Sequence, residues 1–477
     1  MTKRRLILIL ATVTALGALA LAAARARDVP NVATGFVASV LCSETFVSGR
    51  DPDKIFTETT AAMPGTGLIS WALRYRVDRA HHDVTVTLAG FGKSHAVYRG
   101  ALGCVLDHGG AVNEGAAAIA ETKLPAALLP DIAGPSEVAP QTPELAAALD
   151  RAFKEPLHPP FRRTKAIVVV KDGRIVAERY ADGYGIDTPI LGFSTTKSVT
   201  SALIGVLVRQ GKLAVDKPAA VAAWQDPRDP RGAITIDQLL RHTAGLALGS
   251  SLQASLASVI EPVNRMKYRE RDMAAFAEAA ELETAPGSAW NYHDGNYVIL
   301  GHLIGNAVGG TPSDVLRFAG TELFGPLGMR HVTLEFDGAG TLESATQMLA
   351  PARDWARFGM LYLNDGVVGG QRVLPQGWVT YSASPTPNAF VGYGAGFWTN
   401  LGDSFGANHR VERGWPRDAF FAKGTIGQYV IVIPSKRLVI VRFGKTPNWP
   451  LDADGVSDLV RDVIAATGGK ARVAGVN

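Results

Sequence analysis

Several signatures of common functional classes are missing from this chain of 477 residues. It has no His-Glu-x-x-His motif and no cluster of cysteine and histidine, so no metal site is predicted. It has no stripe of lysine and arginine interleaved with aromatic residues, which argues against a nucleic-acid partner. The Gly-x-Ser-x-Gly elbow of α/β-hydrolases is also absent, because residues 192–196 lack the second glycine. No motif implies an organic cofactor.

Long apolar runs are scarce as well, and the one that exists lies at the N-terminus. Three basic residues at positions 3–5 precede apolar residues 6–23, and an Ala-Arg-Ala cleavage site ends at Ala26. We therefore predict that residues 1–26 are a signal peptide and that the protein is periplasmic or secreted. The alternative is an uncleaved membrane anchor facing the periplasm, since about 18 apolar residues can just span a bilayer.

Cysteine is almost absent, because Cys42 and Cys104 are the only two. In an exported protein this even count predicts one disulfide, which would close a loop of about 60 residues and stabilise the fold by about 4 kcal/mol. Two separate buried thiols are the alternative. With 47% hydrophobic and 19% charged residues, the composition is that of a soluble globular protein. The length exceeds one ordinary core, so two domains are expected.

The pattern of predicted secondary structure changes along the chain and divides it into two units. In the first, segments 71–77 and 83–89 alternate apolar and polar residues as half-buried strands do, and a third strand is expected at 95–99. Prolines between positions 125 and 143 then mark a linker. The predicted division is an accessory unit at 27–128, a linker at 129–149, a main domain at 150–470 and a tail at 471–477.

The main domain begins and ends with strands. Its first two strands are joined by Asp172-Gly173, a two-residue hairpin turn, and a capping box at 235–238 opens one of the helices in the middle. This order predicts an α+β fold, in which an antiparallel sheet is flanked by helices and accompanied by an all-helical subdomain and the small N-terminal β-containing unit. The predicted elements are strands at 165–171, 174–180, 428–433 and 438–442, and helices at 143–153, 235–245 and 456–466.

The strongest chemical signal is Ser194, which is followed by Lys197 at the start of the apolar segment 192–209. Positions i and i+3 share one face of a helix, so the hydroxyl and the amine can meet at the helix N-terminus. A serine hydroxyl needs a nearby base to act as a nucleophile, and a lysine can be that base if its surroundings depress its pKa. For this short match alone, an ordinary helix cap is the alternative.

Two further segments carry candidate chemistry. Tyr292 lies between a Pro-Gly turn and an apolar helix, and a tyrosine can shuttle a proton when a nearby ammonium lowers its pKa. Residues 420–434 place glycines beside a strand, where a backbone N–H could face a developing oxyanion. The alternatives are a half-buried aromatic residue and an ordinary hairpin. We interpret His242 and His293 as structural residues.

Six sequence motifs follow one another along the chain, at 192–209, 239–246, 286–301, 322–329, 354–359 and 427–434. Their order resembles that of the β-lactamase-related serine hydrolases, which include class C β-lactamases, D-Ala-D-Ala carboxypeptidases, family VIII esterases and 6-aminohexanoate-dimer hydrolases. The resemblance implies a β-lactamase/transpeptidase-like fold, with Ser194 as nucleophile, Lys197 as its base partner and Tyr292 as proton shuttle. It also implies an oxyanion hole formed by the backbone amides of Ser194 and Ala422, with Lys423 as the one-residue alternative.

Two departures from the family pattern narrow the expected chemistry. The third position of the β-lactamase motif Tyr-x-Asn is Asp294, and the motif Lys-Thr-Gly is replaced by residues 420–422, or by 422–424 in the other register. The usual anchor for a β-lactam or peptidoglycan carboxylate is therefore missing, and Asp294 would repel such an anion or attract an amine. Asp294, Lys423 and Gly424 are the candidate substrate-binding residues.

We therefore predict a serine hydrolase that cleaves a small-molecule amide or ester, most like a 6-aminohexanoate-dimer hydrolase or a family VIII carboxylesterase. The Gly-x-x-Gly-Gln pattern at 424–428 also resembles that branch. A D-Ala-D-Ala carboxypeptidase or β-lactamase is the alternative within the same class. A non-catalytic envelope binding protein, with the accessory unit as its interaction module, is the alternative from another class. No oligomeric state is predicted.

Overall fold

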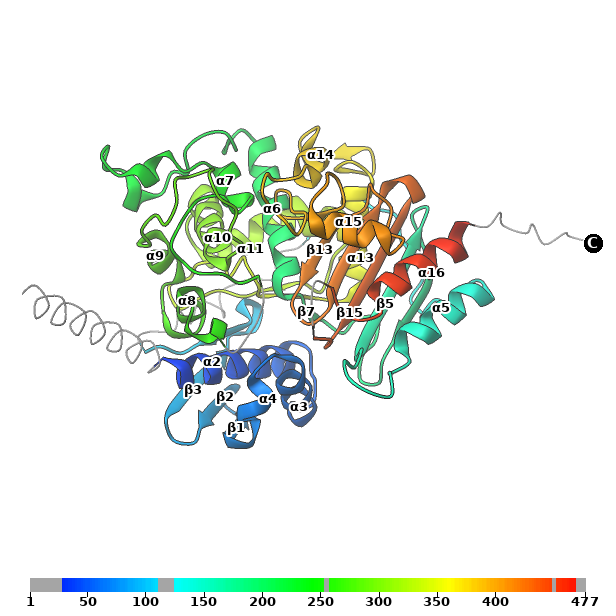
Figure 1. Ribbon diagram of the computed structural model, residues 1–477, viewed down its shortest axis with the longest axis horizontal. Coiled ribbons are helices and arrows are strands. Elements are labelled where there is room, and N and C mark those ends of the chain that lie inside the picture. The colour runs from blue at the N-terminus through cyan, green and yellow to red at the C-terminus, as the bar shows by residue number, and fades with distance from the viewer. Residues whose placement is uncertain (1–27, 110–123, 253–256, 448–451, 469–477) are drawn as a thin grey trace, which may run out of the picture.

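The computed structural model describes residues 28–109, 124–252, 257–447 and 452–468. A small N-terminal unit, blue in Figure 1, lies beneath a larger body that holds helices on one side and the main sheet on the other. The predicted signal peptide and C-terminal tail lie outside the described residues. Within the described part, no helix combines the length and apolarity that a membrane span requires.

The main sheet has six antiparallel strands in the order β12-β13-β14-β15-β5-β6. Strand β15, from the C-terminal part of the main domain, pairs with β5, from its N-terminal part, so that Val441 lies opposite Val168. The predicted hairpin is confirmed, and Asp172 (φ 50°) and Gly173 (φ 87°) both have the positive φ that a tight hairpin turn needs. The strands are β5 Thr164–Lys171, β6 Arg174–Tyr180, β12 Trp398–Thr399, β13 Phe420–Gly424, β14 Gln428–Ile433 and β15 Leu438–Gly444.

Both faces of the main sheet are buried, which explains its unbroken apolar strands. Along β5, Ala166, Val168 and Val170 belong to one hydrophobic core, whereas Ile167 and Val169 belong to a second. Successive side chains on a strand point to opposite faces of the sheet, so neighbouring residues of β5 enter different cores even though all of them are apolar. The second core is covered by α5 (Pro143–Phe153) and α16 (Val456–Gly468), and the first by α13 (Ala352–Leu363).

A helical subdomain is inserted between β6 and β12. Its helix α7 opens at the predicted capping box of Thr235 and Gln238 but ends at Leu240, so the predicted end at Gly245 is wrong. The helix cannot continue because His242 adopts a φ of 60°, a left-handed value. The subdomain and the antiparallel sheet together confirm the α+β architecture. The helices are α6 Thr196–Arg209, α7 Ile236–Leu240, α8 Pro262–Arg269, α9 Met273–Glu278, α10 Asp294–Val308 and α11 Pro312–Ala319.

The N-terminal unit is a four-stranded antiparallel sheet packed on helix α2 (Val29–Cys42). Its three predicted strands are confirmed, but α2 was not predicted. Residues 32–38 of this helix are all buried, since the sheet covers one side and α8 contacts another. A helix buried all round has no polar stripe, so residue periodicity does not reveal it. The other elements are α3 Pro52–Ala62, α4 Thr66–Ile69, β1 Leu73–Asp78, β2 Asp83–Leu88, β3 Gly92–Tyr98 and β4 Cys104–Leu106.

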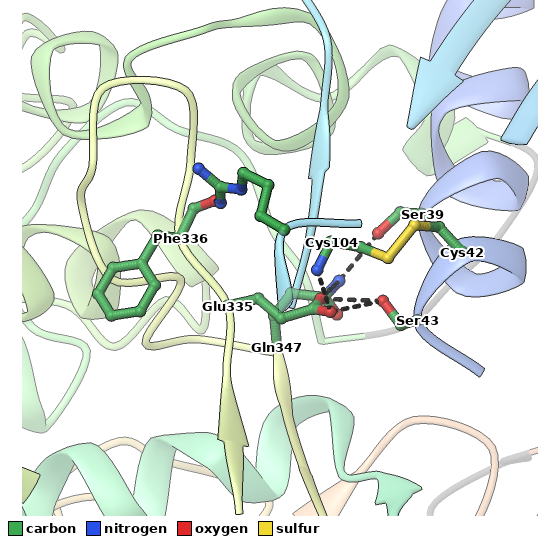
Figure 2. The surroundings of a disulfide bond; sticks show 8 residues. Ser39, Cys42, Ser43, Cys104, Glu335, Phe336 and Gln347 are labelled. Carbon is green, nitrogen blue, oxygen red and sulfur yellow. Dashed lines mark hydrogen bonds between the residues drawn. A yellow bond between two sulfur atoms is a disulfide. The ribbon is translucent and has the colours of Figure 1, made fainter. Parts of the chain in front are cut away.

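The N-terminal unit is fastened to the larger body beside its disulfide, as Figure 2 shows. Cys42 and Cys104 are bonded, which confirms the predicted pair. Next to them, the Glu335 carboxylate accepts hydrogen bonds from the Ser43 hydroxyl (2.8 Å), the Cys104 amide (2.8 Å) and the Gln347 side chain (3.0 Å). Ser43 and Cys104 belong to the N-terminal unit and Gln347 to the larger body, so this buried carboxylate joins the two.

Glu335 is expected to make this junction sensitive to pH. Burial raises the pKa of Glu335 from its ordinary value of 4.5 to about 7. The folded protein therefore holds this proton more tightly than the unfolded chain, and the resulting stabilisation, complete below pH 4.5, is lost as the pH rises through 7. We expect this group to lower the free energy of unfolding by on the order of 3 kcal/mol over that range.

The matched variant for this prediction is Glu335→Gln, which keeps the shape of the side chain and removes its titration. Denaturant unfolding of both proteins across the same pH series measures the difference. The variant should show the smaller loss of stability as the pH rises. Parallel pH profiles for the two proteins would contradict the role of Glu335.

Candidate active site

The candidate nucleophile Ser194 lies in a short 3₁₀ turn, η5 (Phe193–Thr195), that leads into helix α6. Phe193 has a φ of 49°, which is uncommon for a residue other than glycine. Its side chain is buried in the apolar core of the N-terminal unit, and this packing offsets the strain. Lys197 follows one turn later, and its Nζ lies 3.0 Å from the Ser194 Oγ. The structure thus brings the first two predicted residues into contact.

The Lys197 side chain is surrounded by hydrogen-bond acceptors. Besides the Ser194 hydroxyl, it contacts Asp294 Oδ1 at 2.6 Å and the Ala345 carbonyl oxygen at 3.2 Å. An ammonium has three N–H donors and no acceptor, so these three partners match its charged form. The side chain is 1% exposed, and a charge at such depth requires an opposite charge beside it.

Asp294 supplies that charge and shares it between two lysines. Its second oxygen, Oδ2, accepts a hydrogen bond from Lys267 Nζ at 2.8 Å. Burial by itself would raise the pKa of Asp294, but the ammonium groups of Lys197 and Lys267 hold it well below its usual range. Burial opposes the charge of Lys267, yet Asp294 raises the pKa of this lysine above its ordinary value. With both oxygens engaged, Asp294 balances charge inside the protein rather than offering a free site for a substrate amine.

Lys267 was not predicted from the sequence. It lies in helix α8, within no recognisable motif, and no signal in its neighbourhood along the chain could have identified it. It reaches the site because α8 packs near the N-terminus of α10, where Asp294 begins the helix.

Tyr292 lies in the same cluster, just before helix α10. Its ring centroid is 4.8 Å from Lys197 Nζ and 4.3 Å from the ring of His242. Among the described residues, its hydroxyl has no hydrogen-bond partner. His242 and His293 are buried, and burial lowers both pKa values, that of His293 to about 4. The structure therefore packs the phenol against the lysine and leaves both histidines neutral and structural.

Two candidate substrate-binding residues have other roles in the structure. Lys423 Nζ lies 3.3 Å from Asp452 and 4.5 Å from the ring centroid of Trp398, and the side chain is 7% exposed. Gly424 packs against the serine turn, where a Cβ would come within 2.2 Å of the Gly192 carbonyl oxygen. Glycine is needed here so that β13 can approach the nucleophile closely, not so that a substrate can.

The predicted oxyanion donor Ala422 does not fit the register of β13. The Asn400 amide donates to the Ala419 carbonyl, so Ala419 faces β12. Backbone groups of successive strand residues point to opposite sides, and Ala422 therefore directs its amide toward β14. The same alternation turns the amide of Lys423 away from β14. Of Ala422, Lys423 and Thr425, Thr425 alone lines the cavity of Ser194.

Ser194 opens into a cavity of about 180 Å³ between the main domain and the N-terminal unit. The main domain contributes Asp294, Lys267 and Thr425 to its lining. The backbone amide of Ser194 lies in the first turn of a helix, where it has no partner within that helix. Within the described ranges, no group of three or more side chains is arranged to hold a metal ion.

Comparison with known proteins agrees with this architecture. The family model described as beta-lactamase matches residues 149–465. A curated relative, the 6-aminohexanoate-dimer hydrolase of Paenarthrobacter ureafaciens, is 24% identical over 222 residues, which are 45% of this chain and 56% of the relative. The chain thus spans about half the length of that relative.

Two solved structures show the same fold. A Bacillus anthracis protein named as a 6-aminohexanoate-dimer hydrolase is 22% identical, with a TM-score of 0.53 over 72% of this chain and 89% of its own. A family VIII carboxylesterase is 18% identical, with a TM-score of 0.51 over 70% of this chain and 99% of its own. The predicted β-lactamase/transpeptidase-like fold is confirmed. Because the family model covers more than half of its length, the chain belongs to the beta-lactamase family.

Proposed function

We propose that this protein is a serine hydrolase that cleaves an amide or ester of a small molecule through an acyl-enzyme. The observation that carries the proposal is the 3.0 Å contact between Ser194 Oγ and Lys197 Nζ at the wall of a cavity. The names of the relatives, a dimer hydrolase and a carboxylesterase, support an amide or ester bond as the target.

The Ser194 proton must pass to a neighbouring group as the oxygen attacks the carbonyl carbon. Lys197 is the base expected from the family resemblance, but its three contacts fit the ammonium form, which cannot accept a proton. Tyr292 has an uncommitted hydroxyl and a ring 4.8 Å from that ammonium. We therefore assign Tyr292 as the proton shuttle, which takes the serine proton and passes a proton to the leaving group. Lys197 stabilises the negative charge that develops on the serine oxygen.

Two backbone amides are proposed to bind the oxyanion of the tetrahedral intermediate. One belongs to Ser194, in the short turn just before α6, and the other to Thr425, which lines the same cavity. Water then attacks the acyl-enzyme, with Tyr292 accepting a proton from the water and returning it to Ser194.

We also propose that the protein is exported to the periplasm or beyond, as the N-terminal sequence predicts. The disulfide between Cys42 and Cys104 supports this location, because such bonds persist in oxidising compartments.

A substrate panel tests the proposed function. We expect p-nitrophenyl butyrate, which has no carboxylate, to be hydrolysed with a kcat/KM at least about 100-fold above that of a chromogenic cephalosporin, and the linear dimer of 6-aminohexanoate is the amide probe of the panel. The physical reason is that the lysine of β13, Lys423, is directed to Asp452 instead of a substrate carboxylate. Preferred turnover of the cephalosporin, or a stable penicillin adduct on Ser194, would favour the carboxypeptidase or β-lactamase alternative. A protein that hydrolyses none of them and resists fluorophosphonate labelling would be a binding protein.

A further inference from the structure

The N-terminal unit supplies one wall of the Ser194 cavity, although this unit lies outside the region that the family model matches. Apart from Thr66, the residues of this wall are apolar. They include Val32, Ala33 and Phe36 of α2, Met63 and Ile69 around α4, and Leu88 at the end of β2.

This wall is closely packed against helix α8 of the larger body. A Cβ at Gly35 of α2 would come within 2.9 Å of the Tyr268 Cβ in α8. The ring of Phe36 packs edge-on against the ring of Tyr268, with centroids 5.9 Å apart. The same unit also buries Phe193, next to the nucleophile, and Ile426, next to Thr425. The wall and both flanks of the reacting centre therefore form one packed structure.

The main domain supplies most of the polar groups of the cavity. They include Ser194, Lys267 and Asp294, with Ser251 and Thr425 beside them, and the apolar or aromatic residues on this side are Phe193, Val259 and Tyr268. A ligand that fills the cavity must therefore present a polar reacting group to one side and an apolar group to the other. A charged group placed against the apolar wall would lose its hydration without gaining a partner.

We propose that the N-terminal unit selects the substrate, and that the substrate carries a short, uncharged apolar chain next to the scissile carbonyl. This inference rests on the proposed hydrolase function of Ser194. The cavity of about 180 Å³ is smaller than the roughly 300–1,000 Å³ of sites for drug-sized ligands, so its volume suits a chain of a few carbons. An acyl chain and an alkyl leaving group present the same chemistry to this wall, and the test separates them.

Calorimetric binding of simple amides to the Ser194→Ala protein tests the wall without requiring catalysis. The probes are acetamide, hexanamide, which extends the acyl side, and N-butylacetamide, which extends the leaving side. Each buried methylene strengthens binding by roughly fourfold, so we expect at least one of the longer amides to bind at least about tenfold more tightly than acetamide. Equal affinities for all three amides would overturn the inference.

Two substitutions in α2, made in the Ser194→Ala protein, connect that preference to the wall. Ala33→Leu places a larger apolar side chain in the cavity and should reduce the preference for the longer amide by at least about fivefold. Val40→Ala, in the same helix but buried in the core of the unit, removes packing away from the cavity and should keep the preference. Loss of the preference in Val40→Ala but not in Ala33→Leu would contradict the proposal.

Ester hydrolysis by the otherwise unaltered protein separates this inference from the proposed function. A protein that hydrolyses p-nitrophenyl acetate while the Ser194→Ala variant shows no chain-length preference is a hydrolase without a selective wall. A protein that prefers the longer amide but hydrolyses no ester has the wall without the proposed chemistry.

Discussion

Replacement of Ser194 by alanine is expected to lower kcat/KM for p-nitrophenyl acetate by a factor on the order of 10⁴. The substitution removes the oxygen that forms the acyl bond and leaves the cavity and the two lysines in place. Release of p-nitrophenol measures the rate, and mass spectrometry after fluorophosphonate treatment should show one adduct on Ser194 in the unaltered protein. The variant should retain only that residual hydrolysis and show no adduct.

Ser198→Ala is the matched control for this experiment. Ser198 lies in the same helix and is buried, but its hydroxyl donates to the Gly396 carbonyl at 2.6 Å and does not contact Lys197. Its loss should cost about 1 kcal/mol of stability and leave kcat/KM within about threefold. Retention of activity by Ser194→Ala would remove the serine from the mechanism.

Replacement of Asp294 by alanine is expected to lower the free energy of unfolding by about 3–5 kcal/mol. Its carboxylate is the shared partner of Lys197 and Lys267, whose side chains are 1% and 12% exposed. Removing it leaves two nearly buried ammonium groups side by side, each desolvated and repelled by the other. Urea unfolding at neutral pH measures the loss.

A double-mutant cycle identifies the charge as the cause. Asp294→Asn keeps the shape of the side chain and removes its charge, so it should also destabilise the protein. Adding Lys267→Met removes one of the two ammonium groups, and the double variant should regain at least about half of the stability lost in Asp294→Asn. Additive losses in the two single variants and the double variant would show that Lys267 and Asp294 do not balance each other.

Features built from neighbouring residues could be predicted because their geometry is local. Ser194 and Lys197 are one helical turn apart, so their contact follows once a helix begins there. The turn at Asp172-Gly173 and the cap at Thr235 depend on backbone preferences of only a few residues. Helix α7 shows where this reasoning ends, because the turn at His242 is held by packing around its ring.

Features built from distant segments could not be predicted in the same way. Which side the Ala422 amide faces depends on how β13 pairs with β12 and β14, and a shift of one residue reverses it. Lys267 and Glu335 lie in no motif, yet burial and their partners give each a marked pKa shift.

The amino-acid sequence alone was sufficient to identify the candidate nucleophile, its lysine, the tyrosine, the paired cysteines and the family. It could not show that Asp294 binds two lysines, or that the N-terminal unit closes the cavity of Ser194 with an apolar wall. Coulomb energies and the burial of apolar surface depend on distances between segments far apart in the chain, and only the packed structure establishes those distances.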